Sequence, residues 1–165
     1  MLRAIVFYVF LFVSSYAFAM SQVPSNEMQD EKTSPQMAKD FTLPTASGAS
    51  KSLMEARAGK KSVLFFWATW CPHCHDALMD MNRRMDDIKQ KGINVILVDV
   101  GEGKAEVTAY LKNNHIALDS FVDTDNSLQD AYDLVGVPTL FFIDEKGMIH
   151  NMAHAFPDDY EQLFN

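Results

Sequence analysis

The sequence has little positive charge. Its 14 lysine and arginine residues face 22 aspartate and glutamate residues, which gives a formal net charge of −8 at pH 7. Nucleic acids and anionic lipid surfaces are both recognised through clustered positive charge, and this acidic chain shows no basic patch. We therefore expect no nucleic acid among its partners.

Cysteine is scarce, because Cys71 and Cys74 are the only two in 165 residues. Two cysteines are too few for a disulfide scaffold, and a bond between them would enclose only two residues. Closing so short a loop removes little entropy from the unfolded chain. No pattern of a peroxidatic cysteine is visible, which argues against peroxidase activity. We expect the pair to serve chemistry rather than stability.

The chain also lacks an apolar run of the length that a membrane-spanning helix needs, about 20 residues. Its longest candidate, residues 5–19, falls somewhat short. Arg3, the apolar stretch 4–13 and the small residues of Ala17-Phe18-Ala19 follow the order of a signal peptide, with cleavage after residue 19. An uncleaved N-terminal anchor is the alternative. In both cases the folded part lies outside the cytoplasm, where disulfides persist.

The polar residues 20–38, with two prolines and no periodicity, predict a disordered linker. Residues 39–165 predict one α/β domain, in which strands and helices alternate around a mixed, mostly parallel sheet with helices on both faces. The expected strands are 40–43, 62–68, 93–100, 120–123, 138–144 and an antiparallel edge strand at 148–154. The expected helices are 53–58, 72–91, 104–114, 126–135 (capped by Asn126) and 157–164 (Pro157 in its first turn).

The two cysteines permit two different interpretations. Cys71, Cys74 and His75 fit the C-x-x-C-H pattern of covalent haem attachment, whereas the cysteines alone fit the C-x-x-C of a redox-active dithiol. The first would be an electron carrier and the second an enzyme acting on disulfides.

The position of the motif favours the dithiol. Cys71 follows a buried strand and begins a helix, where free backbone N–H groups favour the thiolate. Pro72 suits the first helical turn, and Cys74 lies one turn further along the same face. We expect Cys71 to be the exposed nucleophile and Cys74 the shielded resolving thiol. His73, when protonated, can stabilise the thiolate further.

Haem and metal sites fit these residues less well. Zinc would need four ligands, and Cys71, His73, Cys74 and His75 are too crowded along one helical turn to form a tetrahedron. Haem needs a pocket, but here the motif lies behind the apolar strand of a sheet, which leaves His75 an ordinary helix-surface residue. We expect no metal and no cofactor beyond the disulfide.

The sequence Gly-Val-Pro-Thr at 136–139 adds a distant signal at the start of an apolar strand. With F-W-A-T-W-C-x-x-C and F-I-D-x-x-G, it makes the chain resemble the thioredoxin superfamily, and within it the TlpA/ResA-like extracytoplasmic thiol-disulfide oxidoreductases. The resemblance implies a thioredoxin fold with an inserted helix at 104–113. It also implies that Pro138 is cis beside the dithiol and that the backbone of Val137 pairs with the substrate. Trp70, next to the motif, is expected to line the substrate surface.

The chain departs from the family in two respects, the missing acid and the dipeptide between the cysteines. Phe65 stands where thioredoxin has a buried acid, and Ala77 where ResA-like members have a glutamate. No proton-handling carboxylate can therefore be assigned. Pro72-His73 is the dipeptide of the strong oxidant DsbA, and a stabilised thiolate raises the reduction potential.

The resemblance implies a periplasmic reductase of disulfides in exported proteins, apocytochromes c included, supplied by a membrane thiol donor or acceptor. A disulfide-donating oxidase and, more remotely, a haem carrier are the alternatives. The other histidines are expected on the surface or on an edge strand, and Trp67 in the core. These other histidines are His115, His150 and His154.

Overall fold

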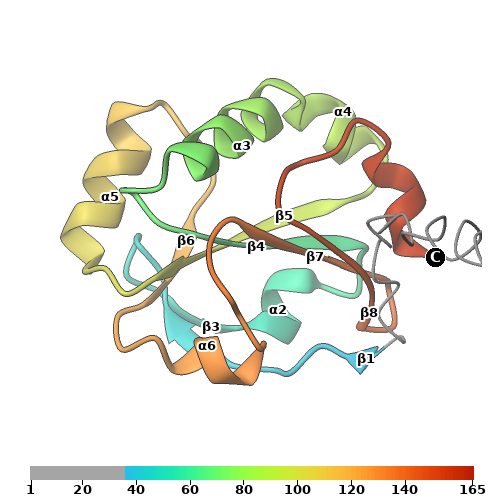
Figure 1. The fold of residues 1–165 in the computed structure, drawn as a ribbon, viewed down its shortest axis with the longest axis horizontal. Coiled ribbons are helices and arrows are strands. Elements are labelled where there is room, and N and C mark those ends of the chain that lie inside the picture. The colour runs from blue at the N-terminus through green and yellow to red at the C-terminus, as the bar shows by residue number, and fades with distance from the viewer. Residues whose placement is uncertain (1–35) are drawn as a thin grey trace, which may run out of the picture. The chain divides into compact units, whose positions relative to one another are not determined.

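A six-stranded sheet with the order β1-β8-β7-β4-β5-β6 forms the centre of the computed structural model, which describes residues 36–165 (Figure 1). Strands β4, β5 and β6 run parallel, whereas β7, β8 and β1 join by antiparallel pairing. The sheet is mixed, as predicted, but its parallel pairing is confined to β4, β5 and β6. The strands are β1 (Gln36–Met37), β4 (Ser62–Trp67), β5 (Asn94–Val100), β6 (Ser120–Asp123), β7 (Thr139–Ile143) and β8 (Met148–Ala153).

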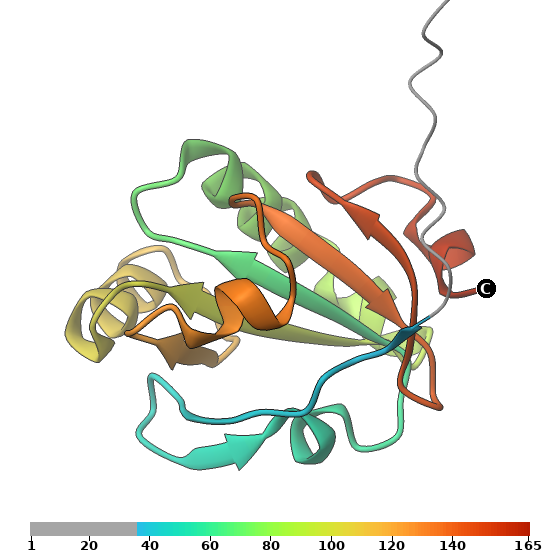
Figure 2. The same cartoon turned by 60° about the horizontal axis from the view of Figure 1, so that its bottom comes forward.

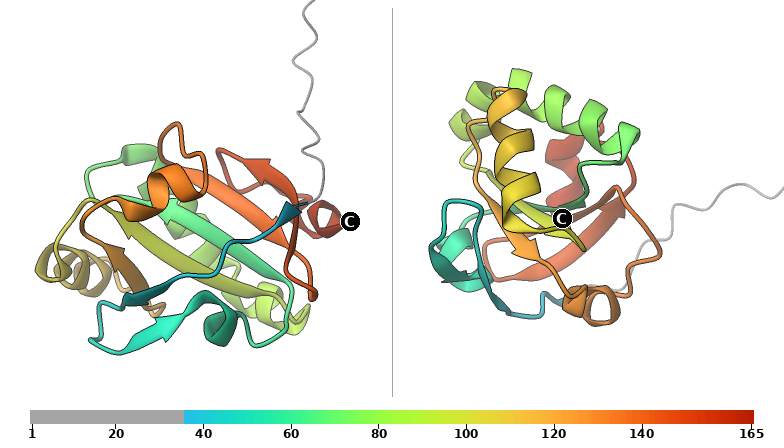
Figure 3. Two further views of the ribbon diagram at one scale, coloured as in Figure 1. Left: turned by 90° about the horizontal axis from the view of Figure 1, so that it is seen from below. Right: turned by 90° about the vertical axis from the view of Figure 1, so that its left-hand side faces the viewer.

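Helices cover both faces of this sheet, as predicted. Helices α3, α4 and α5 lie on one face, and α2, α6 and the β2–β3 hairpin lie on the other (Figures 1 and 2). The view from below in Figure 3 shows the hairpin and α6 in front of the sheet. These elements are β2 (Thr42–Pro44), β3 (Ser50–Ser52), α2 (Leu53–Arg57), α3 (Pro72–Arg83), α4 (Met85–Gln90), α5 (Lys104–Asn113), α6 (Ser127–Ala131) and the 3₁₀ helix η1 (Tyr160–Phe164).

Strand β4 is buried along its whole length, because its alternate side chains enter two separate cores. Phe65 and Trp67 pack on the side of α3, whereas Leu64 and Phe66 pack on the side of α2 and α6. This confirms the strand predicted from the continuous apolar run. Because the run ends at Ala68, the chain leaves the core just before Cys71.

The helix predicted over 72–91 is two helices, divided at Arg84. The Arg84 guanidinium lies 4.8 Å from the ring centres of both Phe156 and Tyr160. It also donates to Asp80 and to the backbone of Asp158. The break therefore falls at the residue that ties α3 to the C-terminal segment.

Other predictions need correction at the two ends of the domain. Strand β8 is not an edge strand, because Gln36 and Met37 pair with it and extend the sheet into the predicted linker. The last helix is a 3₁₀ helix that begins at Tyr160, so Pro157 is not in its first turn. The signal peptide and the rest of the linker lie outside the described residues. Within the described range, no helix is both long enough and apolar enough to span a membrane.

Helix α6 is shorter than predicted and is capped by a different residue. Asn126 adopts a left-handed conformation, and its side chain caps nothing. The buried Asp123 at the end of β6 takes that role. One of its carboxylate oxygens accepts from the Ser127 N–H at 3.0 Å and the other from the Leu128 N–H at 2.9 Å.

We expect Asp123→Ala to lower the free energy of unfolding by about 2–3 kcal/mol, because it removes the carboxylate that caps α6 and leaves the buried Leu128 N–H without its acceptor. Urea denaturation followed by circular dichroism measures the change. Asp125→Ala is the matched control, since Asp125 accepts from the same Ser127 N–H at 3.2 Å but is exposed. Equal losses in the two variants would contradict the assignment of the cap to Asp123.

Candidate active site

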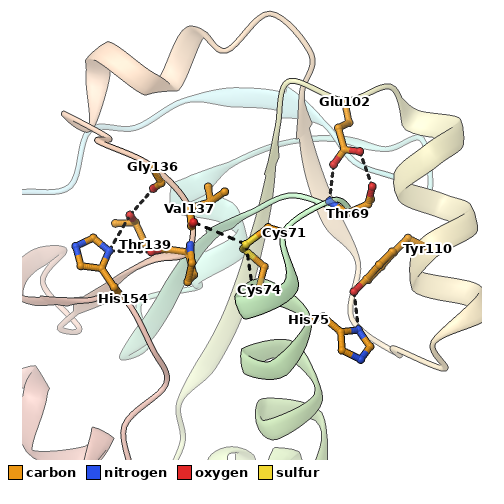
Figure 4. Close-up of a disulfide and its surroundings, with 11 residues drawn as sticks. Thr69, Cys71, Cys74, His75, Glu102, Tyr110, Gly136, Val137, Thr139 and His154 are labelled. Atoms are coloured by element: carbon orange, nitrogen blue, oxygen red, sulfur yellow. Dashed lines mark hydrogen bonds between the residues drawn. A yellow bond between two sulfur atoms is a disulfide. The ribbon is translucent and has the colours of Figure 1, made fainter.

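Cys71 is the N-cap of helix α3 (Figure 4). Its backbone is extended, Pro72 occupies the first helical position, and the Cys74 backbone N–H donates to the Cys71 sulfur at 3.1 Å. A donor at this distance and the free N–H groups of the helix terminus both favour negative charge on that sulfur. The predicted position of Cys71 at the start of a helix is confirmed.

Cys71 and Cys74 form a disulfide, with their Cα atoms 5.2 Å apart. Cys74 is fully buried, as predicted for the resolving thiol. Cys71 was predicted to be exposed, and this is wrong, because only 4% of its surface is accessible. The segment around Val137, distant in sequence, covers it: the Val137 carbonyl oxygen lies 3.7 Å from the Cys71 Sγ.

Residues 136–139 thus form the second side of the site. The Val137–Pro138 peptide is cis, as the resemblance implied. The Thr139 hydroxyl donates to the Gly136 carbonyl at 2.7 Å and so closes the segment on itself. Within the described part of the chain, the Val137 N–H makes no backbone hydrogen bond outside helices and strands. That N–H is available to a peptide that docks beside the disulfide.

His154 is exposed, as the sequence predicted, and it also borders this site. Its Nδ1 donates to the Pro138 carbonyl at 2.8 Å and lies 3.5 Å from the Thr139 hydroxyl oxygen (Figure 4). The β7–β8 hairpin explains this, because Ala153 pairs with Leu140. The turn at 145–147 sets the register of this hairpin, and from that register the contact between His154 and Pro138 could have been predicted.

The two histidines of the motif occupy different surroundings. His73 is exposed and lines a hollow of about 360 Å³ together with Asp76, Asp80 and His154. Its effect on the thiolate remains a prediction. His75 is not an ordinary surface residue, because it is half-buried with its Nδ1 2.8 Å from the Tyr110 hydroxyl. No three His, Cys, Asp or Glu side chains among residues 36–165 are arranged to hold a metal ion.

Beside the disulfide, a second hollow of about 330 Å³ has a neutral lining. Trp70, 69% exposed, forms one wall, and Leu134 and Val137 contribute apolar surface. The amide side chains of Asn126 and Gln129 supply its polar groups. The role of Trp70 in lining the substrate surface remains a prediction. Trp67 is fully buried in the core, as expected.

Two acids near the site were not predicted. Asp99, near the end of β5, is fully buried. Its pKa is raised to about 8, mainly by burial and secondly by the neighbouring Glu102 carboxyl. Glu102 accepts from the Thr69 N–H and from the Thr69 hydroxyl, each at 2.5 Å (Figure 4). An acidic residue within the apolar run 93–100 is the signal that could have drawn attention to Asp99.

Comparison with known proteins agrees with this geometry. Residues 35–152 match the model of the AhpC/TSA family. The chain is 32% identical over 131 residues to the thiol-disulfide oxidoreductase ResA of Bacillus subtilis, a match that covers 76% of this chain and 73% of ResA. It is 31% identical to ResA of Geobacillus kaustophilus over 68% of this chain and 64% of that protein.

Solved structures show the same fold. A thiol:disulfide interchange protein of the thioredoxin family from Chlorobium tepidum superposes with a TM-score of 0.67 at 25% identity, covering 79% of this chain and 94% of that one. StoA from Bacillus subtilis superposes with a TM-score of 0.63 at 25% identity, and the match covers 78% of this chain and 96% of StoA. With the disulfide at the start of α3, these matches identify the chain as a member of the AhpC/TSA family and a thiol-disulfide oxidoreductase of thioredoxin fold.

Proposed function

We propose that the protein is a periplasmic reductase of disulfides in exported proteins, including apocytochromes c before haem attachment. The observation that carries the proposal is the Cys71 sulfur at the N-cap of α3, 3.7 Å from the Val137 carbonyl. This arrangement supports a stabilised thiolate beside a backbone segment that a peptide can pair with. The similarity to the thiol-disulfide oxidoreductase ResA supports the disulfide chemistry, and the reducing direction is what the resemblance noted in the sequence implies.

The reaction needs no group other than the two cysteines. In the reduced protein the Cys71 thiolate attacks one sulfur of the substrate disulfide, and the other sulfur leaves as a thiolate that takes up a proton. Cys74 then loses its proton and attacks the Cys71 sulfur, which releases the second substrate sulfur as a thiol. The protein is left with its own disulfide, and a membrane thiol donor returns two electrons and two protons.

Substrate docking follows from the residues around the disulfide. The Val137 N–H can pair with an extended peptide, while the exposed Trp70 and the adjoining hollow receive its neighbouring side chains. Pro72, also exposed, borders the same surface. A substrate segment without charge suits this lining, because a buried charge would find no partner there.

A disulfide-donating oxidase is the second candidate, favoured by the dipeptide Pro72-His73. An imidazolium beside the thiolate stabilises the reduced protein and so raises its potential. The haem alternative is weaker, because covalent attachment would use both thiols, and here they form a disulfide in which Cys74 is fully buried. Export through the predicted signal peptide remains part of the proposal.

The reduction potential tests the direction. We expect a value near that of thioredoxin, about −270 mV, when the protein is equilibrated with glutathione or dithiothreitol buffers and its free thiols are trapped. A value near about −120 mV would instead identify an oxidant. Residues 20–165 are the form to use, since the leader is expected to be removed.

Cysteine variants test the order of attack. Cys74→Ser should accumulate mixed disulfides between Cys71 and exported proteins, because the resolving thiol is missing. Cys71→Ser should trap none, since Cys74 is fully buried. Non-reducing electrophoresis of cells expressing each variant, followed by mass spectrometry, identifies the trapped proteins. Equal trapping by both variants would contradict the assignment of Cys71 as nucleophile.

His73→Ala tests the origin of the potential. Loss of a cation near the thiolate should lower the potential by about 10–30 mV, which corresponds to about 0.5–1.4 kcal/mol. His75→Ala is the matched control within the same helical turn, because its ring contacts Tyr110 rather than the sulfur. An unchanged potential in His73→Ala would show that His73 is a passive surface residue.

A further inference from the structure

Asp99 is a buried acid that the reaction described above does not use. It is fully buried, and its two carboxylate oxygens have no hydrogen-bond partner among the described residues. In the parallel pairing of β4 with β5 it lies opposite Trp67, so both side chains are on the face of the sheet that carries α3 and the disulfide. An unpaired carboxyl in such a place is costly unless it holds a proton.

Glu102 connects Asp99 to the cysteines. Its carboxyl is near enough to Asp99 to perturb that group, and it accepts two hydrogen bonds from Thr69. Thr69 lies in the turn before the nucleophile, where the Cys71 N–H donates to the Ala68 carbonyl at 3.3 Å. Glu102, three residues after the buried Asp99, is thus bonded directly to the turn that presents Cys71.

We propose that a proton held by Asp99 allows the charged Glu102 to stay nearby, so that the two acids form a pH-dependent clamp on the turn 68–71. With Asp99 neutral, the charged Glu102 can stay beside it and hold Thr69. When Asp99 ionises, the two carboxylates repel each other. Glu102 is half-buried and can turn toward water, whereas Asp99 is enclosed, so the hold on Thr69 is lost. Asp99 and Glu102 are positioning residues, because they act on Cys71 through Thr69.

Few other titratable groups face this pair. Asp123 on β6 adds a like charge to Asp99. Tyr110 on α5 has a raised pKa, through burial first and then the charges of Asp76 and Glu102. His75 on α3 reaches the pair only through the Tyr110 hydroxyl. The Asp99 pKa is raised to about 8, mainly by burial and secondly by the Glu102 carboxyl. Its titration is therefore separated from those of ordinary carboxylates.

The clamp has a consequence for the dithiol. A negative charge on the same face of the sheet disfavours the thiolates of the reduced protein. Ionisation of Asp99 should therefore shift the equilibrium from the dithiol toward the disulfide as the pH rises. This inference rests on the disulfide chemistry in either direction and needs no knowledge of the substrate.

The first test uses the oxidised protein, in which the cysteines do not titrate. The amide resonance of Thr69 in ¹H–¹⁵N correlation spectra should move between pH 6 and 10 with a midpoint near about 8. Asp99→Asn, which keeps the shape and cannot ionise, should lose this transition. Glu102→Gln, which removes the partner charge, should alter the Thr69 resonance already at pH 6.

Asp76→Asn is the matched control, since it removes an exposed acid close to the cysteines but outside the clamp. It should retain the Thr69 transition. A flat wild-type titration, or a transition that survives in Asp99→Asn, would overturn the proposal whether or not the protein reduces its proposed substrates.

The second test measures the equilibrium of the dithiol with glutathione. Asp99→Asn and wild type should agree within about twofold at pH 6. At pH 9 the variant should be more easily reduced by about fivefold, at the low end of couplings between sites. A ratio that does not change with pH would indicate a purely structural role for Asp99 and overturn the clamp.

Discussion

The burial of β4 on both faces is the constraint on which the site depends. Its alternate side chains fill two cores, so the strand cannot shift its register without exposing one of them. The strand ends at Trp67, and the turn that follows places Cys71 at the N-cap of α3. The nucleophile owes its position to packing that lies several residues away from it.

The site reconciles two opposing requirements on the same sulfur. Cys71 must be reactive, which the Cys74 N–H and the helix terminus favour, yet it is almost wholly buried in the disulfide state. Its cover is the Val137 segment rather than a fixed wall of the core. A peptide that pairs with Val137 therefore approaches the sulfur along the side where Trp70 is exposed. With the docking mode proposed above, this burial restricts the direction from which a substrate sulfur can approach Cys71.

The sequence predicted the features that depend on neighbours along the chain. The buried strand, the helix start at Cys71 and the deeper Cys74 all follow from local pattern. The features it missed depend on contacts across the fold. Burial of Cys71 requires Val137, 66 residues later, and the place of His154 requires the hairpin register. The signal peptide remains a prediction, because it lies outside the described residues.

The acids illustrate why such features resist prediction from one strand alone. Phe65 and Ala77 are apolar where relatives of this kind place a carboxyl, so a search along β4 and α3 ends without one. Parallel pairing puts Asp99 of β5 opposite Trp67, on the face that carries the disulfide. A carboxyl can therefore reach this face from a neighbouring strand, two residues beyond Phe65 in register. Only the pairing of the strands decides which positions are equivalent. The acid can therefore be recognised from the paired strands of the structure, but not from the sequence motif.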